Sequence, residues 1–183
     1  MKGFALILLL MTFTSANCQL IENEREANIF GVGMGLRSST GIFGATYGRS
    51  FAKRFEAKSY IGIRYGLVVS AGLNTKILSK KSIETALSFD YSYCFSGDLT
   101  FEESNNTTDN YEVSDGQFLN FYLTTRFFPK QDFCIQLCLG YSNSISNQKI
   151  YHKFGPNKNQ RWVEGFAGEG LLIELGLLFP FGR

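Results

Sequence analysis

The chain has little histidine and little proline, and it lacks long apolar runs beyond its N-terminal segment. It has one histidine and three prolines among 183 residues. Beyond the N-terminal segment, no stretch is long and apolar enough to cross a bilayer as a helix. Any membrane insertion must therefore use strands, because a spanning segment has to satisfy its own backbone hydrogen bonds. The lone histidine has no metal-ligand spacing around it, so we expect no metal and no cofactor.

Charge of neither sign dominates. The 18 Lys and Arg residues against 16 Asp and Glu give a net charge of +2, and the basic residues are scattered along the chain. A nucleic-acid-binding surface would concentrate them. We therefore expect no nucleic acid among the partners.

Cysteine is also scarce, with four residues in the whole chain. Beyond Cys18 three remain, which is an odd number. Cys134 and Cys138 share one face of an expected strand, about 13 Å apart at roughly 3.3 Å per residue, which is too far for a disulfide. The sequence predicts that these two residues and Cys94 are small buried thiols.

The first residues are typical of a secretion signal. Lys2 precedes an apolar run, and small polar residues follow that run. We expect cleavage after Cys18, which makes residues 1–18 a signal peptide and residues 19–27 a polar leader. An uncleaved anchor helix and a lipid-modified Cys18 are the alternatives, although the apolar run is short for a bilayer span.

Behind this segment, apolar and polar residues alternate in eight stretches, which is the pattern of β-strands. The last stretch is the clearest, because its apolar residues from Leu171 to Phe179 share one face. We predict an all-β fold, an eight-stranded antiparallel up-and-down transmembrane barrel over residues 28–183. The expected strands are 28–36, 42–51, 55–68, 73–78, 82–95, 116–128, 132–144 and 164–179, with a loop at 70–72.

The connections between these stretches differ in length. Those after the second, fourth and sixth stretches are tight, whereas residues 96–115 and 145–163 form long polar loops. Outer-membrane barrels have short periplasmic turns and longer external loops. Aromatic residues gather toward both strand ends, as expected for two interfacial girdles. The tight-turn group is Phe30, Phe51, Phe55, Phe127, Phe128, Phe133, Phe179 and Phe181; the other group is Tyr65, Tyr91, Tyr93, Phe95, Tyr141 and Trp162.

The polar face of the strands carries charges of both signs and many glycines. A water-facing surface gains nothing from glycine, which weakens strands, whereas the lumen of a narrow barrel needs small residues. We therefore place this face inside and the apolar face against lipid. Charges in such a lumen would have to be paired. The expected ion-pair network comprises Glu56, Lys58, Arg64, Lys76, Glu84, Asp90, Arg126 and Glu174.

These features resemble the small outer-membrane β-barrel proteins of Gram-negative bacteria, in particular the eight-stranded membrane domain of outer-membrane protein A. The resemblance covers about residues 28–181 and rests on the repeated pattern rather than on one motif. It implies an outer-membrane location, contact with outer-membrane lipid, insertion by the barrel-assembly machinery, and a structural or surface-interaction role. The chain departs from the usual terminal Phe, because Gly182 and Arg183 follow Phe181.

Three functions stay open at this stage. The first is a non-enzymatic outer-membrane barrel with a closed lumen, which meets an extracellular partner through residues 96–115 and 145–163. The second is a soluble exported lipocalin-like barrel that carries a small apolar ligand. The third is a lipid A-modifying enzyme, for which a His-x-Ser pair would be expected. His152 is followed by Lys153 and Phe154 instead, so we predict no catalytic residues.

The loop at 96–115 is rich in acidic residues. The acidic part lies around Glu102, Glu103, Asp109, Glu112 and Asp115. They are expected to be a solvated surface, since charge runs usually are; a divalent cation or a basic partner is the alternative.

Overall fold

The structure is a computed structural model that describes residues 28–102, 108–129 and 132–181. The expected signal peptide and polar leader lie outside the described residues, as do Glu103, residues 130–131 and the last two residues. No helix among the described residues is of the length and hydropathy needed to cross a membrane.

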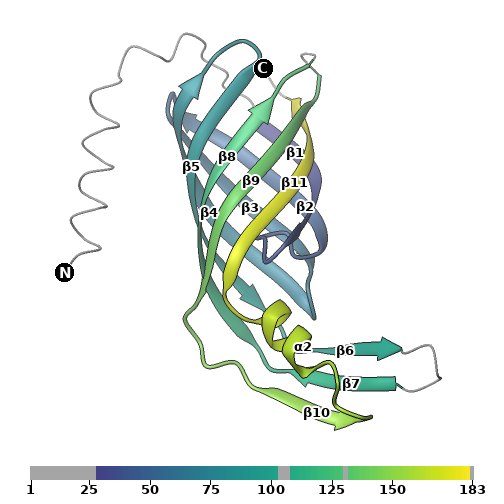
Figure 1. The fold of residues 1–183 in the computed structure, drawn as a ribbon. Coiled ribbons are helices and arrows are strands. Elements are labelled where there is room, and N and C mark those ends of the chain that lie inside the picture. Colours follow the sequence, from purple (N-terminus) through teal and green to yellow (C-terminus); the bar gives the residue numbers. More distant parts are fainter. Residues whose placement is uncertain (1–27, 103–107, 130–131, 182–183) are drawn as a thin grey trace.

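Eight antiparallel strands form a closed barrel (Figure 1). Seven pairings join strands that follow one another around the barrel, and β1 closes it by pairing with β11 from Asn28↔Phe181 to Leu36↔Ile173. This confirms the predicted fold class. The barrel strands are β1 (Asn28–Leu36), β2 (Phe43–Ala52), β3 (Phe55–Ile63), β4 (Leu67–Ser79), β5 (Ile83–Cys94), β8 (Gly116–Phe127), β9 (Cys134–Ser144) and β11 (Gly170–Phe181).

A three-stranded sheet and a short helix lie beyond one end of the barrel (Figure 1). We call this sheet the small sheet; its order is β10 (Ile150–Phe154), β7 (Thr108–Val113) and β6 (Gly97–Glu102). The helix is α2 (Gln160–Ala167). We call this end the loop end, and the opposite end, with the short turns and the start of β1, the tight-turn end.

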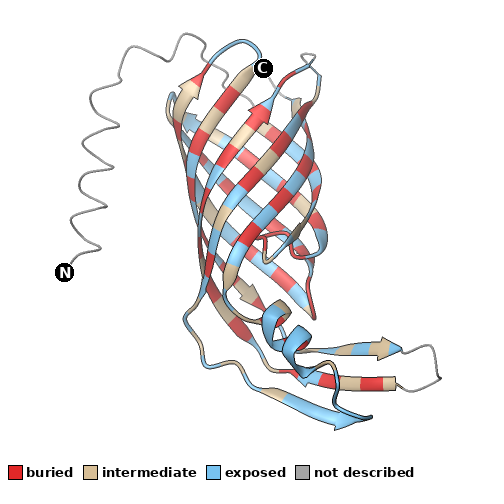
Figure 2. Ribbon diagram, viewed as in Figure 1, coloured by how far each residue is buried: buried red, intermediate tan, exposed pale blue. Residues whose placement is uncertain are grey.

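Burial alternates residue by residue along the barrel strands (Figure 2). Large apolar side chains point outward: Ile61 is 53% exposed and Phe121 is 50% exposed. Polar side chains point inward, where Glu56 and Asn120 are almost fully buried. Cys94, Cys134 and Cys138 are free and buried, as predicted. Two members of the predicted girdles, Tyr65 and Phe128, are buried instead.

The predicted loop at 70–72 is wrong, because these residues lie within β4. The turn between β3 and β4 falls earlier, at Arg64–Gly66, where the Arg64 N–H donates to the Gly66 carbonyl. Small residues suggested a loop, but they face the lumen or the outer surface of a continuous strand. Gly72 in particular lies beside Asp90, where a Cβ atom would overlap the Asp90 side chain.

Two further boundaries differ from the prediction. Residues 97–102 and 108–113 form the paired strands β6 and β7 rather than an irregular loop, and residues 164–167 belong to α2 rather than to the last strand. Strand β7 has its own alternation, since Tyr111 and Val113 are buried while Glu112 between them is exposed. The many acids of this segment concealed that pattern.

Close backbone approach explains one of the lumen glycines. The turn between β1 and β2 folds into the barrel mouth, where Gly41 pairs with Ile63 and the Ile42 N–H donates to the Ile63 carbonyl at 2.6 Å. At Gly62, beside this contact, an added Cβ atom would overlap the Thr40 carbonyl oxygen.

We therefore expect Gly62→Ala to destabilise the barrel by about 1–3 kcal/mol, the usual cost of overpacking a tight contact. Gly165→Ala in α2 is the matched control, because the space around Gly165 is open and Ala favours helix. Urea unfolding monitored by circular dichroism would measure both variants. Equal stability of the two variants would contradict the close approach.

Candidate functional site

The lumen nearest the tight-turn end is closed by an ion-pair network around Arg126. Its guanidinium donates to both carboxylate oxygens of Glu56, at 2.6 and 2.7 Å, and to Glu84 at 2.9 Å. Its Nε atom donates to the side-chain carbonyl of Gln136 at 3.0 Å, and Lys76 pairs with Glu84 at 3.2 Å. Arg126 is 2% exposed, so this network fills the bore rather than lining a channel.

Register explains why these side chains meet. Glu84 of β5 and Gln136 of β9 are the direct cross-strand partners of Arg126 on β8. Glu56 comes from β3, three strands further round the barrel, and so reaches across the lumen. A narrow barrel makes this reach possible, and the bidentate geometry is the strong form of an Arg–carboxylate contact.

The middle of the lumen contains a lysine between aromatic rings. Lys58 Nζ lies 5.8 Å from the centre of the Tyr60 ring and 6.0 Å from that of Tyr122, within cation–π distance. The two tyrosine hydroxyls are hydrogen-bonded to each other at 2.7 Å. Within the described part of the chain, Lys58 Nζ has no hydrogen-bond partner. Glu174 at this level accepts hydrogen bonds from Gln136 and Thr40, each at 3.2 Å.

The turn between β1 and β2 closes the lumen above that level. Ser39 and Thr40 are buried inside the barrel. The Ser39 hydroxyl donates to Asp90 at 2.6 Å, and Asn120 donates to the other Asp90 oxygen at 2.6 Å. Ser70 donates to the Ser39 backbone carbonyl at 2.9 Å. A segment of small polar residues therefore replaces water as the partner of a buried carboxylate.

Helix α2 covers the barrel mouth at the loop end. Arg64 donates to the backbone carbonyls of Phe166, at 2.9 Å, and Gly168, at 3.1 Å, at the C-terminal end of the helix. Its guanidinium also lies 4.4 Å from the centre of the Phe118 ring. Arg37, from the β1–β2 turn, donates to the Gly165 carbonyl. Cations at a helix C-terminus are favourable, because unpaired carbonyls point there.

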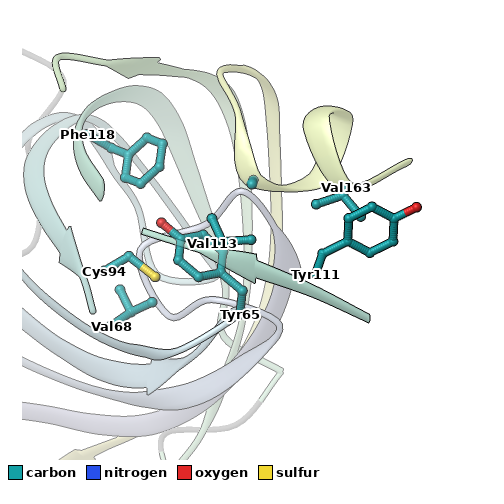
Figure 3. Close-up of a cluster of buried hydrophobic side chains, with 8 residues drawn as sticks. Tyr65, Val68, Cys94, Tyr111, Val113, Phe118 and Val163 are labelled. Carbon is teal, nitrogen blue, oxygen red and sulfur yellow. The ribbon is translucent and has the colours of Figure 1, made fainter. Parts of the chain in front are cut away.

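A buried apolar cluster joins the mouth, the small sheet and the helix (Figure 3). It contains residues from barrel strands, from β7 and from α2. The members are Tyr65, Val68, Cys94, Tyr111, Val113, Phe118, Val163 and Ala167. The small sheet is thus packed onto the barrel through α2 and is not a free loop.

Four of the eight predicted network residues are joined by ion pairs: Glu56, Lys76, Glu84 and Arg126. The other four have different partners. Asp90 and Glu174 are held by neutral hydrogen-bond donors, Lys58 by aromatic rings and Arg64 by the helix carbonyls. Sequence reasoning omitted the uncharged members of the lumen. Asn74, Asn120 and Gln136 occupy the same inward phase of the strands as the charged residues, whereas Ser39 and Thr40 reach the lumen from the β1–β2 turn.

Asp109 organises the chain that leads from the small sheet to α2. Its carboxylate accepts hydrogen bonds from the backbone N–H groups of Asn157 and Lys158, both at 2.9 Å, and from the side chain of Asn159 at 3.1 Å. Burial would raise the pKa of Asp109, but these hydrogen bonds outweigh it and hold the pKa below its ordinary value.

Other acids of this segment also have partners within the protein. Asp98 and Glu112 both pair with Lys153, at 2.9 and 3.3 Å. Asp115 accepts hydrogen bonds from the Tyr93 hydroxyl and the Ser96 backbone N–H, which lower its pKa. Over the described residues, no group of three His, Cys, Asp or Glu side chains is arranged to hold a metal ion.

His152 lies in β10, where its ring is 5.1 Å from that of Tyr111 and its Nε2 is 3.7 Å from Asp109. A carboxylate near a histidine is one part of a catalytic triad, but a nucleophile is also required. Among the residues that the structure describes, no serine is hydrogen-bonded to His152. The Asp109 carboxylate already accepts hydrogen bonds from the backbone N–H groups of Asn157 and Lys158.

The outer surface of the barrel is an apolar belt. One hollow in this belt, of about 310 Å³, is apolar as well and lies between the outward side chains of β1, β2, β9 and β11. Val32, Met34, Phe43, Ile135, Leu175 and Leu177 supply its side-chain walls. A contiguous apolar surface of this extent would be unstable in water.

We expect Arg126→Met to destabilise the barrel by about 3–5 kcal/mol, because it leaves Glu56 buried without its ion-pair partner and Glu84 with Lys76 alone. Adding Glu56→Gln to that variant should restore part of the loss. Lys153→Gln is the control, since exposed ion pairs contribute about 1 kcal/mol or less. Urea unfolding would measure all three variants, and equal losses in Arg126→Met and Lys153→Gln would refute the role of the network.

The lowered pKa of Asp109 predicts that the order of residues 157–159 depends on pH. Because its pKa is lower in the folded protein, its stabilisation is complete above the ordinary value of 3.8 and is lost as the pH falls through the lowered pKa. We expect the amides of residues 157–159 to lose hydrogen-exchange protection in that acid range, after correction for intrinsic rates. Asp109→Asn should remove the protection at every pH, whereas Asp98→Asn should leave it intact. A pH response that survives in Asp109→Asn would assign it to another group.

No protein-family model matches the chain, and no curated protein matches it. The solved structures that are similar to it include the following three. The N-terminal β-barrel domain of Pseudomonas aeruginosa OprF is 13% identical, with a TM-score of 0.55 over 87% of this chain and 100% of that one. A major outer membrane protein from Thermus thermophilus is 14% identical, with a TM-score of 0.48 over 86% of this chain and 100% of that one. Acinetobacter baumannii CarO is 12% identical, with a TM-score of 0.42 over 87% of this chain and 100% of that one. The likeness to the OprF domain shows that this chain shares the eight-stranded fold of an outer-membrane barrel domain.

Proposed function

We propose that this protein is an outer-membrane β-barrel with a closed lumen, which presents the small sheet and α2 as a recognition surface. The observation that carries the proposal is the apolar belt. Side chains such as Leu175, 51% exposed, and Phe121, 50% exposed, would face water in a soluble protein. Hydrocarbon is the solvent that makes such a surface stable, and a closed barrel leaves no unpaired strand edge within it.

The orientation follows from the lengths of the connections. The tight-turn end lies on the periplasmic side, and the small sheet and α2 lie outside the cell, as in other barrels with short periplasmic turns. The partners are then outer-membrane lipid, the barrel-assembly machinery and an external partner that contacts residues 96–115 and 145–163. Loops held on a rigid scaffold often carry the function of such a scaffold.

The soluble lipid-carrying alternative requires apolar rows that line a central cavity. Here the rows point outward, and the interior is filled by polar side chains such as Arg126 and Gln136. The enzyme alternative requires a nucleophile near His152, and the arrangement around Asp109 supports a structural use of both residues instead. We therefore propose a non-enzymatic role.

Detergent fractionation tests the location, and single cysteines test the orientation. We expect a protein that needs detergent and whose gel mobility shifts on boiling. Thr100→Cys in β6 should react with a membrane-impermeant maleimide on intact cells, whereas Lys80→Cys in the β4–β5 turn should react only after the cells are opened. The three described native cysteines are buried and serve as the background. A freely soluble protein, or Lys80→Cys labelled on intact cells, would refute the proposal.

A further inference from the structure

A polar hollow interrupts the outer surface of the barrel near the tight-turn end. It has a volume of about 460 Å³ and is lined by Arg49, Ser50, Phe51 and Ala57. Arg49 of β2 lies opposite Ala57 of β3 and, on its other side, opposite Asn28 of β1. The methyl group of Ala57 fills little of the space beside the guanidinium, which keeps the hollow open.

Arg49 differs from the buried arginines of the barrel. Its side chain is on the outward phase of β2 and is exposed. Within the part of the chain that the structure describes, Arg49 has no hydrogen-bond or ion-pair partner, whereas Arg126 and Arg64 each have several. A guanidinium without an anion on an otherwise apolar face is costly unless it reaches water or a phosphate.

Aromatic side chains mark the level at which Arg49 lies. Phe51 stacks on Phe55 with ring centres 6.1 Å apart, and Tyr47 lies 6.4 Å from Phe181. Aromatic girdles of this kind sit where barrel strands cross from hydrocarbon into lipid headgroups. Arg49 is thus at headgroup depth, at the edge of the apolar belt.

The tight-turn end, near which the hollow lies, carries mostly basic residues. Besides Arg49 in β2, the described short turns contain Lys53, Arg54, Lys80 and Lys81, against one acid, Asp132. A barrel end of this charge attracts an anionic membrane surface, and each basic residue near that surface strengthens binding.

We propose that the hollow binds the phosphate of an anionic phospholipid in the periplasmic leaflet. This inference rests on the proposed membrane location and orientation. The planar guanidinium of Arg49 can donate two parallel hydrogen bonds to a phosphate. The neighbouring Ser50 also lines the hollow, but its hydroxyl accepts a hydrogen bond from Lys76 at 3.3 Å, so Arg49 is the donor on which the site depends. Phe51 contributes the apolar side of the hollow, which suits the glycerol and the start of an acyl chain.

The test uses the full chain in micelles that contain phosphatidylglycerol and phosphatidylcholine in equal amounts, with bound lipid counted by native mass spectrometry. The wild type should retain phosphatidylglycerol preferentially. Arg49→Gln should weaken that retention about fivefold, and Ala57→Leu should weaken it while leaving the charge in place. Arg161→Gln, an exposed arginine at the loop end, is the matched control and should behave as the wild type. The gel shift on boiling shows that each variant is folded.

Three results would overturn the site: equal retention of both lipids by the wild type, equal losses in Arg49→Gln and Arg161→Gln, or complete displacement of phosphatidylglycerol by inorganic phosphate. The last result would mean that the hollow takes any free anion. Failure of the proposed function has a different signature. A chain that is folded and soluble without detergent refutes the membrane location itself, whereas a detergent-requiring chain without lipid preference refutes only the hollow.

Discussion

One constraint shapes the whole molecule: with apolar side chains on the outer face of eight strands, every polar group must be satisfied inside a narrow bore. The bore is too narrow to hold bulk water, so side chains have to pair with each other. Arg126, for example, forms ion pairs with both Glu56 and Glu84. The glycines follow from the same constraint, because each large lumen side chain needs a neighbour that leaves space for it.

The lumen is closed in successive layers that use different chemistry. Ion pairs fill the tight-turn end, aromatic rings surround Lys58 in the middle, and the β1–β2 turn supplies hydroxyl groups to Asp90. Helix α2 then covers the mouth through Arg64. Buried ion pairs are weak sources of net stability but are costly to break, so these layers keep the barrel closed and in register more than they drive folding.

The small sheet and α2 are attached to the barrel at several points. Strand β6 continues from β5, and the chain leaves β7 directly into β8. Asp109 fixes the residues before α2, and the cluster around Tyr111 and Val163 packs the helix onto the mouth. Much of the acidity of this segment is therefore used internally, by Lys153 and by backbone N–H groups. The surface that we propose for recognition is therefore tied to the barrel by these contacts.

The barrel class, the number of barrel strands and the inward phase of the charges could all be predicted from the order of the amino acids, because period-two alternation depends only on neighbouring residues. The three strands of the small sheet were missed. The β3–β4 turn could not be predicted, since Ser70 and Gly72 have the composition of a loop and only their pairing with Ser92 and Asp90 of β5 shows them to be strand. Nor did the pattern reveal which lumen groups meet. Glu56 and Arg126 are 70 residues apart, and their contact depends on the closure of the barrel, which brings distant strands within reach across one bore.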